Sequence, residues 1–205
     1  MANFDFVRQT LPAVHADCVR AESYLTSDPR AACFYARRVV EGLVSYLYDV
    51  LALPLPYRDD LAAKVSDPGF QARVPHGITA KLTTIRKVSN TAVHDGRLIR
   101  PDVALAVLRE LFNVVVWASY HHSPHPEVVP LQARFDPEAA AKAAPLSRAE
   151  VARLAQQFQA RDDAHARELA VRDEQLAARD AELAELRAQI AAAQASLAPD
   201  TRDYN

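Results

Sequence analysis

The sequence predicts an all-α protein, a small helical bundle followed by a long charged helix with coiled-coil character. Three observations support this class. The chain contains only 4 glycines beside 13 prolines, and half of its 205 residues are hydrophobic. Apolar residues recur every three to four positions along most of the chain, as in amphipathic helices. Runs of Val and Ile that alternate with polar residues between turn signals, which would predict strands, are missing from the sequence.

The first two predicted helices cover residues 4–25 and 28–51. In the first, apolar residues follow helical spacing, and Pro12 is expected to kink or restart the helix. The second has Asp28 as its N-cap and Pro29 at its first helical position. Its apolar residues cover most of the helix circumference, so we expect this helix at the centre of the core.

Three further helices complete the predicted bundle. A short helix over residues 59–66 precedes a Pro-Gly turn, and a long helix over residues 78–94 ends before Gly96. The last begins near Pro101, and its apolar positions continue to Tyr120. Long helices joined by short connections are typical of a bundle, which we place at residues 1–122.

The pattern changes after the last of these helices. Residues 123–146 are rich in Pro and Ala without apolar periodicity, which predicts a linker. Ser147 and Glu150 then form a capping box that begins an uninterrupted helix over residues 147–198. We interpret residues 199–205 as the start of a connection to a downstream nuclease or helicase region.

Apolar residues in the long helix repeat every seven positions, at Leu169, Leu176, Leu183, Ile190 and Leu197. A lone solvated helix has no need of such a line, so the repeat predicts a partner helix. We therefore expect a homodimer that forms through the bundle, the coiled coil or both. The companion seam is poor, because either Asp173 and Asp180 or Arg172 and Arg179 would lie on it. A single charged spacer helix is the alternative, since Ala, Glu and Arg favour helix in either case.

Composition and charge exclude several classes of protein. The net charge of −2 divides into +2 for residues 1–125 and −4 for residues 126–205, so neither part is a strongly basic nucleic-acid binder. The sequence has no 20-residue apolar run and no signal peptide, which predicts a cytoplasmic protein without membrane contact. Cys18 and Cys33 do not form a zinc or disulfide pattern, and phosphate-binding glycine loops are missing. Neither a metal nor another cofactor is expected.

Arg86, Asn90 and His94 form a polar stripe, because residues four positions apart share one face of a helix. Apolar residues occupy the positions beside them, so the stripe is expected to meet a partner instead of bulk water. The favoured interpretation is a structural network with Arg37 and Glu41, since buried polar groups need hydrogen-bond partners.

Residues 81–100 carry the one basic concentration of the chain, where five Lys or Arg face only Asp95. The candidates for nucleic-acid contact are Lys81, Lys87, Arg97 and Arg100. Such clusters usually form a solvated face, and weak contact with phosphates of DNA or RNA is the alternative. His121, His122 and His125 could suggest a metal site, but adjacent histidines point to different helix faces and only the carboxylate of Glu127 is near, so they predict a frayed helix end instead.

Residues 1–122 resemble the N-terminal helical domain of unknown function on the restriction subunit of type I restriction-modification systems and related helicase-like proteins. That domain belongs to the HEPN superfamily. The resemblance rests on Ala21-Glu22 with Asp28-Pro29, on the Arg-Arg-Val-Val-Glu segment ending at Glu41, and on Ile85-Arg86 through Asn90 to His94. It implies a dimerising bundle that is followed by a long charged helix. After that helix the family has a segment that resembles Asp203-Tyr204-Asn205 and leads into a nuclease.

The resemblance implies a non-catalytic assembly or regulatory module of a DNA-translocating phage-defence protein, with other restriction-modification subunits as partners. The whole protein would be an ATP-dependent type I site-specific restriction endonuclease, while this chain alone is not expected to be an enzyme.

The alternative is a HEPN-type ribonuclease or RNA-binding, toxin-like domain, with Arg86, Asn90 and His94 as catalytic candidates. Active HEPN ribonucleases carry an Arg separated from a His by four to six residues. Here Ser89 stands five positions before His94. Lys87 meets the spacing only as a substitute for Arg, and it lacks the bidentate fork that holds a phosphate.

Overall fold

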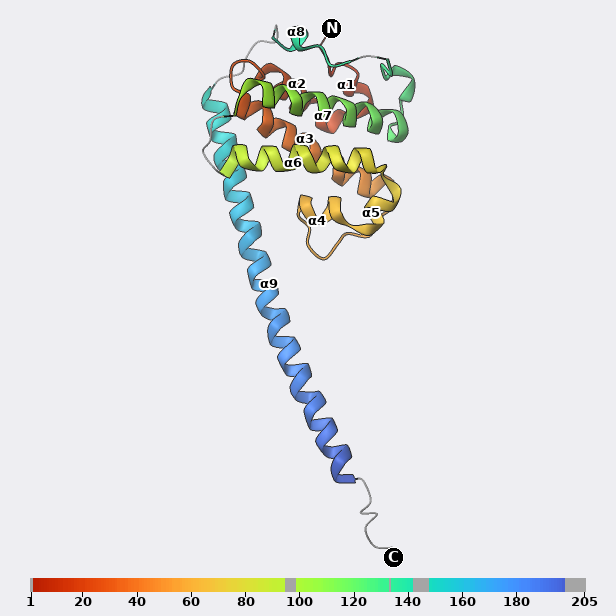
Figure 1. Cartoon of the computed structure of the whole chain (residues 1–205), viewed down its shortest axis with the longest axis vertical. Helices are drawn as coiled ribbons and strands as arrows, with labels where there is room; N and C mark the ends of the chain where they lie inside the picture. Colours follow the sequence, from red (N-terminus) through yellow and green to blue (C-terminus); the bar gives the residue numbers. More distant parts are fainter. Residues whose placement is uncertain (1, 95–98, 133, 142–147, 198–205) are drawn as a thin grey trace, which may run out of the picture. The chain divides into compact units, whose positions relative to one another are not determined.

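The computed structural model describes residues 2–94, 99–132, 134–141 and 148–197, and every regular element in these ranges is a helix. The predicted all-α class is therefore confirmed. The chain divides into two units, Met1–Gln157 and Phe158–Asn205. The first unit contains the bundle, and the described part of the second is a single helix (Figure 1).

The bundle contains, in chain order, α1 (Val7–Thr10), α2 (Pro12–Ser23), α3 (Pro29–Val50), α4 (Leu61–Ser66), α5 (Pro68–Arg73), α6 (His76–His94) and α7 (Pro101–His122). The 3₁₀-helix η1 (Pro126–Val128) and α8 (Pro137–Ala141) follow, and then the long helix α9 (Arg148–Leu197). The first predicted helix is divided at Pro12, which begins α2, because the first turn of a helix tolerates proline.

Aspartate side chains cap three of these helices. Asp28, Asp60 and Asp67 each accept a hydrogen bond from the backbone N–H three residues further on, at 3.0, 2.8 and 2.9 Å. These caps begin α3, α4 and α5. The pair Pro68 and Gly69, which we predicted as a turn, instead forms the first turn of α5, because Asp67 supplies its cap and proline suits that position.

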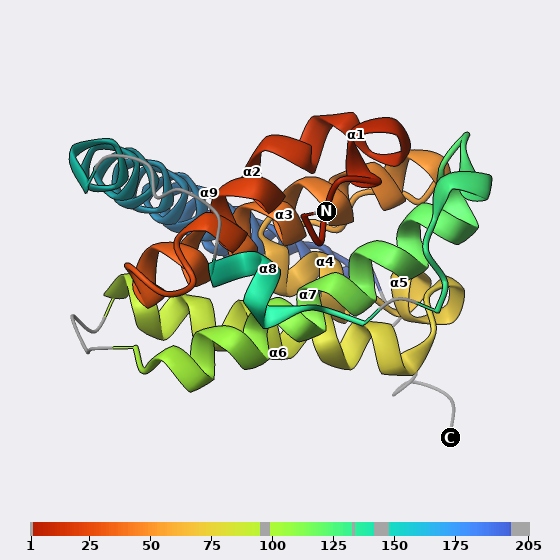
Figure 2. The same cartoon turned by 90° about the horizontal axis from the view of Figure 1, so that it is seen from above.

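Helix α3 lies at the centre of the bundle. It packs against α2 on one side and against α6 and α7 on the other (Figure 2). Its buried residues cover most of its circumference, and Leu43, Val44 and Leu47 are completely buried. A Cβ atom at Gly42 would lie only 2.9 Å from Val14 Cγ1, so the glycine permits the close crossing of α2 and α3.

Helix α7 is the other main core helix. Among the described residues it alone has the length and hydropathy of a membrane span, and half of that apolar window is buried. Its packing against α3 and α6 identifies it as a core helix of the bundle.

Part of the segment that we predicted as a linker packs on the bundle. Val129, Phe135 and Ala140 are buried. The ring of Phe135 lies 6.2 Å from that of Phe4 and 6.1 Å from that of Phe112. Isolated apolar residues among prolines have no periodicity, so the sequence pattern did not reveal this contribution to the core.

Asn3 joins the beginning of the chain to α2 and to the segment before α8. Its backbone N and its Nδ2 donate hydrogen bonds to Glu22 Oε1, at 3.1 and 2.6 Å. Asn3 Nδ2 also donates to the Asp136 carbonyl oxygen at 2.8 Å, and Asp136 N donates to Asn3 Oδ1 at 2.6 Å. Glu22 is 1% exposed, and its burial raises the pKa of the carboxyl, which the hydrogen bonds from Asn3 lower in part.

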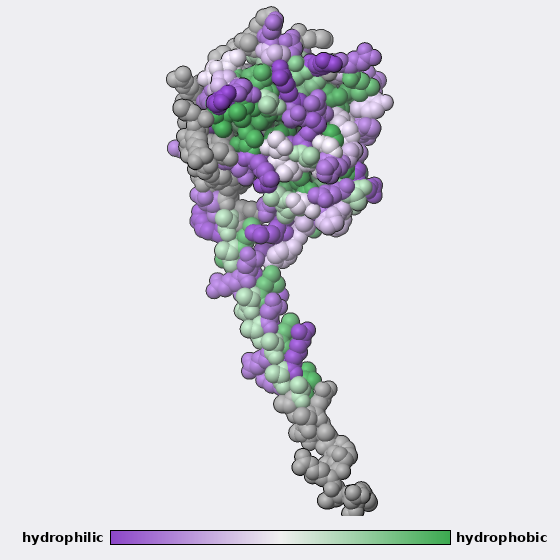
Figure 3. Space-filling model, in the orientation of Figure 1, coloured by the Kyte–Doolittle hydropathy of each residue, from purple (hydrophilic) through white to green (hydrophobic). Residues whose placement is uncertain are grey.

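The described part of the second unit is one continuous stretch of α9. Three residues of the heptad line, Leu176, Leu183 and Ile190, are 41%, 49% and 58% exposed. Hydrophobic side chains recur among hydrophilic ones along this helix (Figure 3). The predicted connection at residues 199–205 lies outside the described residues.

Candidate functional site

The residues of the predicted polar network lie on two helices, α3 and α6, which pack against each other. Arg37 and Glu41 lie one turn apart on α3 and form an ion pair, with 3.0 Å between Nε and Oε1. Their side chains are only 11% and 18% exposed. On α6, Arg86 and Asn90 are half-buried. His94 is the last residue of α6, and its side chain lies outside the described residues.

Two oxygen atoms of α6 are buried without a hydrogen-bond partner within the described part of the chain, Ser89 Oγ and Asn90 Oδ1. Ser89 is completely buried. A buried polar atom without a hydrogen-bond partner lowers the stability of the folded protein by on the order of 1–3 kcal/mol. A polar group that came within hydrogen-bonding distance of either oxygen would therefore stabilise α6 in its place. The sequence pattern did not single out Ser89 as a buried group, because one serine within a helical pattern gives no sign of burial.

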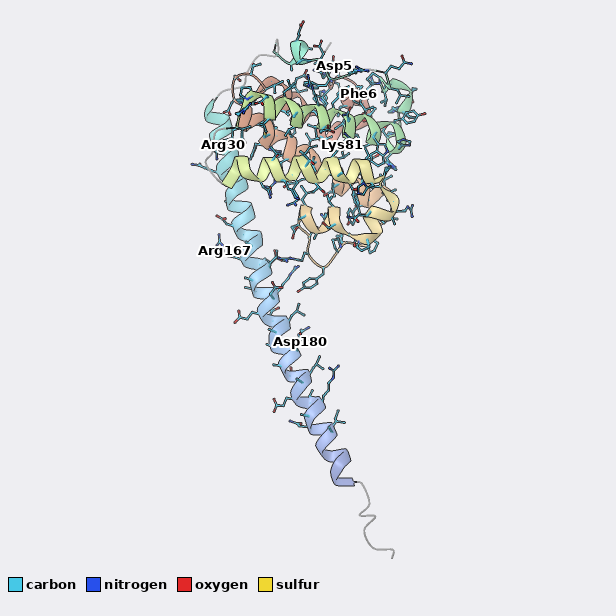
Figure 4. All side chains as sticks on the ribbon, viewed as in Figure 1. Asp5, Phe6, Arg30, Lys81, Arg167 and Asp180 are labelled. Atoms are coloured by element: carbon cyan, nitrogen blue, oxygen red, sulfur yellow. The ribbon has the colours of Figure 1, made fainter. Side chains whose placement is uncertain are left out.

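Carboxylates neutralise two of the four residues predicted to contact nucleic acid. Lys81 on α6 (labelled in Figure 4) forms an ion pair with Glu110 on α7. Arg100 holds Asp102 through two hydrogen bonds, at 2.9 and 2.7 Å, and these lower the pKa of the Asp102 carboxyl.

The other two predicted contacts are Lys87, which is exposed, and Arg97, which lies outside the described residues. The charge available to a phosphate is therefore smaller than the sequence of residues 81–100 suggests. Glu110 is 29 residues from Lys81 in sequence, so a count of the charged residues within 81–100 did not include it.

The histidines near the end of α7 are held by aromatic contacts. The rings of His121 and His122 lie 5.7 and 5.0 Å from that of Trp117, and the Tyr46 hydroxyl donates to the His122 carbonyl oxygen at 2.5 Å. Burial lowers the pKa of His122, and the neighbouring His121 adds to this effect. Helix α7 ends at His122, so the two histidines lie at a helix end, as the sequence predicted. The described residues contain no cluster of His, Cys, Asp or Glu arranged to hold a metal ion.

We expect His94→Ala to lower the stability of the protein more than it changes any ribonuclease activity, because the sequence places His94 on the polar stripe. Loss of one partner from a buried network costs about 1–3 kcal/mol. Thermal unfolding and cleavage of single-stranded RNA would be measured for the same preparations. Thr84→Ala, an exposed change on the same helix, is the control. Rapid RNA cleavage that disappears in a fully folded His94→Ala protein would instead establish a ribonuclease.

The comparisons with known proteins give one match. The model of a family described as a domain of unknown function (DUF4145) matches residues 19–161. This stretch begins in α2, includes the rest of the bundle with α8, and extends into α9. No curated protein and no solved structure matches the chain.

Proposed function

We propose that this chain, which belongs to the DUF4145 family, is a non-catalytic assembly module in which the bundle docks partner subunits and α9 associates with a further helix. The observation that carries this proposal is the exposed middle of the heptad line, Leu176, Leu183 and Ile190, on a 50-residue helix that follows a folded bundle; Leu169, at the start of the line, is 8% exposed. Burial of a Leu or Ile side chain contributes about 1.5–3 kcal/mol. Leu176, Leu183 and Ile190 are all exposed, so a partner helix would gain stability from covering them.

The charges of the bundle support an assembly role over RNA cleavage. Lys81 and Arg100, two of the four candidates for phosphate contact, are already paired with Glu110 and Asp102. The spacing of the HEPN ribonuclease motif is met only by Lys87 in place of Arg, and Ser89, another position that the spacing allows, is completely buried. An RNA-binding or RNA-cleaving function remains the alternative, and the His94 experiment above tests it.

The larger protein that we propose is a type I restriction subunit, an ATP-dependent, DNA-translocating defence enzyme of the cytoplasm. The support is the resemblance of residues 1–122 to the N-terminal helical domain of such subunits, together with the long charged helix that follows it. Partners would be the other subunits of the restriction-modification complex. Reading the gene beyond the codon for Asn205 tests this assignment. Nuclease and helicase motifs there would support it, and a stop codon would contradict it.

Removal of α9 is expected to abolish self-association. We expect light scattering to give a dimer mass for the full chain and a monomer mass for a chain that ends at Pro145. The double variant Leu176→Glu/Leu183→Glu should also be monomeric while it keeps the length of the chain. Val171→Glu, at an exposed position away from the heptad line, is the matched control and should remain dimeric. Monomer masses for every variant and for the unmodified chain would exclude α9 as the assembly element.

A further inference from the structure

A line of charged residues lies beside the heptad line of α9. Asp173, Asp180 and Arg187 each follow a leucine of that line by four residues, and all three are exposed (Asp180 in Figure 4). A fourth member of this line, Gln194, is seen in the sequence only. On a helix with 3.6 residues per turn, a residue four positions on is rotated by about 40°. The charged line is therefore a close neighbour of the leucine line.

Alanines border the other side of this charged line, at Ala170, Ala177, Ala184 and Ala191, each directly after a heptad residue. A residue one position on is rotated by about 100°. The charged line consequently lies between the leucines and the alanines. A helix that covers both the leucines and these alanines must also cover Asp180 and Arg187, whereas Leu186, which is 47% exposed, lies on the other side of the leucine line.

The order of the charges distinguishes two orientations of a homodimer. In a parallel pair each residue faces its own copy, so Asp173, Asp180 and Arg187 would each meet a like charge at the seam. Like charges in such positions are destabilising. In an antiparallel pair the end of the line with Asp173 and Asp180 faces the end with Arg187 and the neutral Gln194 of the other helix, and a two-fold axis near Leu183 brings Asp180 beside Arg187 of the second copy twice.

We propose that α9 pairs with the α9 of a second copy in antiparallel orientation, held by reciprocal Asp180–Arg187 ion pairs. This inference rests on the proposed assembly role of α9 and adds the partner and its direction. The occupant is a second copy because the charge sequence is complementary to its own reverse. A heterologous partner is an outcome of the experiments below.

Charge reversal tests the ion pairs. Asp180→Arg would place two arginines together in the antiparallel pair, and we expect it to weaken self-association at least roughly tenfold at low salt, because both ion pairs at the seam become repulsive contacts. The double variant Asp180→Arg/Arg187→Asp restores complementarity and should dimerise like the unmodified chain. A parallel pair would only exchange an Asp–Asp contact for an Arg–Arg contact, so Asp180→Arg would change little. Glu185→Arg carries the same charge change on the outer face of the helix and is the control.

Distances between spin labels test the orientation directly in the full chain. Labels would be attached to single cysteines that replace the exposed Ala164 or Ala181. The natural Cys18 and Cys33 are buried, and burial raises the pKa of both thiols, that of Cys33 to about 12, so neither reacts in the folded protein.

In the antiparallel dimer we expect a short distance between labels at position 181 and on the order of 50–60 Å at position 164, given a rise of 1.5 Å per residue. Short distances at both positions would overturn the antiparallel orientation and leave the assembly role intact. A chain that pairs only with a different protein would overturn this inference. A chain that stays monomeric at every concentration would overturn both this inference and self-assembly through α9.

Discussion

Replacement of Leu43 by alanine is expected to lower the free energy of unfolding of the bundle by about 2–5 kcal/mol. Leu43 is completely buried on α3, the helix that α2, α6 and α7 all contact. The substitution removes buried methyl groups and leaves a cavity that tightly packed neighbours fill only in part. Since small domains are stable by only about 5–15 kcal/mol, this single change removes a large share of the total.

Urea denaturation followed by the fluorescence of Trp117 would measure this effect. Trp117 is the only tryptophan of the chain and lies on α7, so it reports the bundle and not α9. Ser45→Ala is the control, because Ser45 lies on the same helix two residues after Leu43 and is exposed. This change should shift the free energy of unfolding by less than about 0.5 kcal/mol. Equal stability of the Leu43 and Ser45 variants would contradict the central position of α3.

Replacement of Asn3 by alanine is expected to destabilise the bundle by roughly 1–3 kcal/mol at neutral pH. The change removes the Nδ2 group of Asn3, which donates a hydrogen bond to Glu22 Oε1 at 2.6 Å. Glu22 is buried, so its carboxylate would lose a hydrogen-bond partner that water does not replace. The same substitution also removes the hydrogen bonds that hold Asp136.

The loss should shrink as the pH falls. Burial raises the pKa of Glu22 in the folded protein above its value in the unfolded chain, which is about 4.3. A carboxyl with a raised pKa contributes stability that is full below the unfolded pKa and is lost as the pH rises through the folded pKa. Without Asn3 the pKa of Glu22 rises further, so the penalty is greatest when the carboxyl is ionised and smaller once it is protonated.

Melting temperatures at neutral pH and at about pH 5 would test this pH dependence. Glu22→Gln is the matched control, because it keeps an oxygen acceptor for Asn3 and removes the charge. In that background the cost of Asn3→Ala should vary little with pH. The stability loss caused by Asn3→Ala could instead depend on pH equally in the natural protein and in the Glu22→Gln variant. That result would show that the carboxyl of Glu22 does not cause the pH dependence.

The helices that the sequence predicted well have local signals. Asp28 and Pro29 mark the start of α3 through contacts within one turn, and the apolar circumference of this helix predicts its central position. The uninterrupted length of α9 is similarly readable from neighbouring positions, while Ser147 of its predicted capping box lies outside the described residues.

The features that sequence reasoning missed depend on residues far apart in the chain. Phe135 is buried because Phe4 and Phe112 surround it, and nothing near Phe135 in sequence indicates this. In the same way, Lys81 was counted as available for phosphate because its partner Glu110 lies on another helix. Contacts between distant segments determine both the burial of Phe135 and the pairing of Lys81. The composition of one sequence window does not reveal such contacts.

The hydrogen bonds between Asn3 and Asp136 join residues that are 133 positions apart, and this separation constrains when the protein can mature on the ribosome. Asn3 and Phe4 are synthesised first, yet they reach Asp136 and Phe135 only after the whole of α7 has emerged. Domains fold as units during synthesis, so the bundle can close while α9 is still being translated. A nascent chain can therefore complete its bundle before it has the helix that we propose binds a second copy, so that pairing through α9 would follow the folding of the bundle.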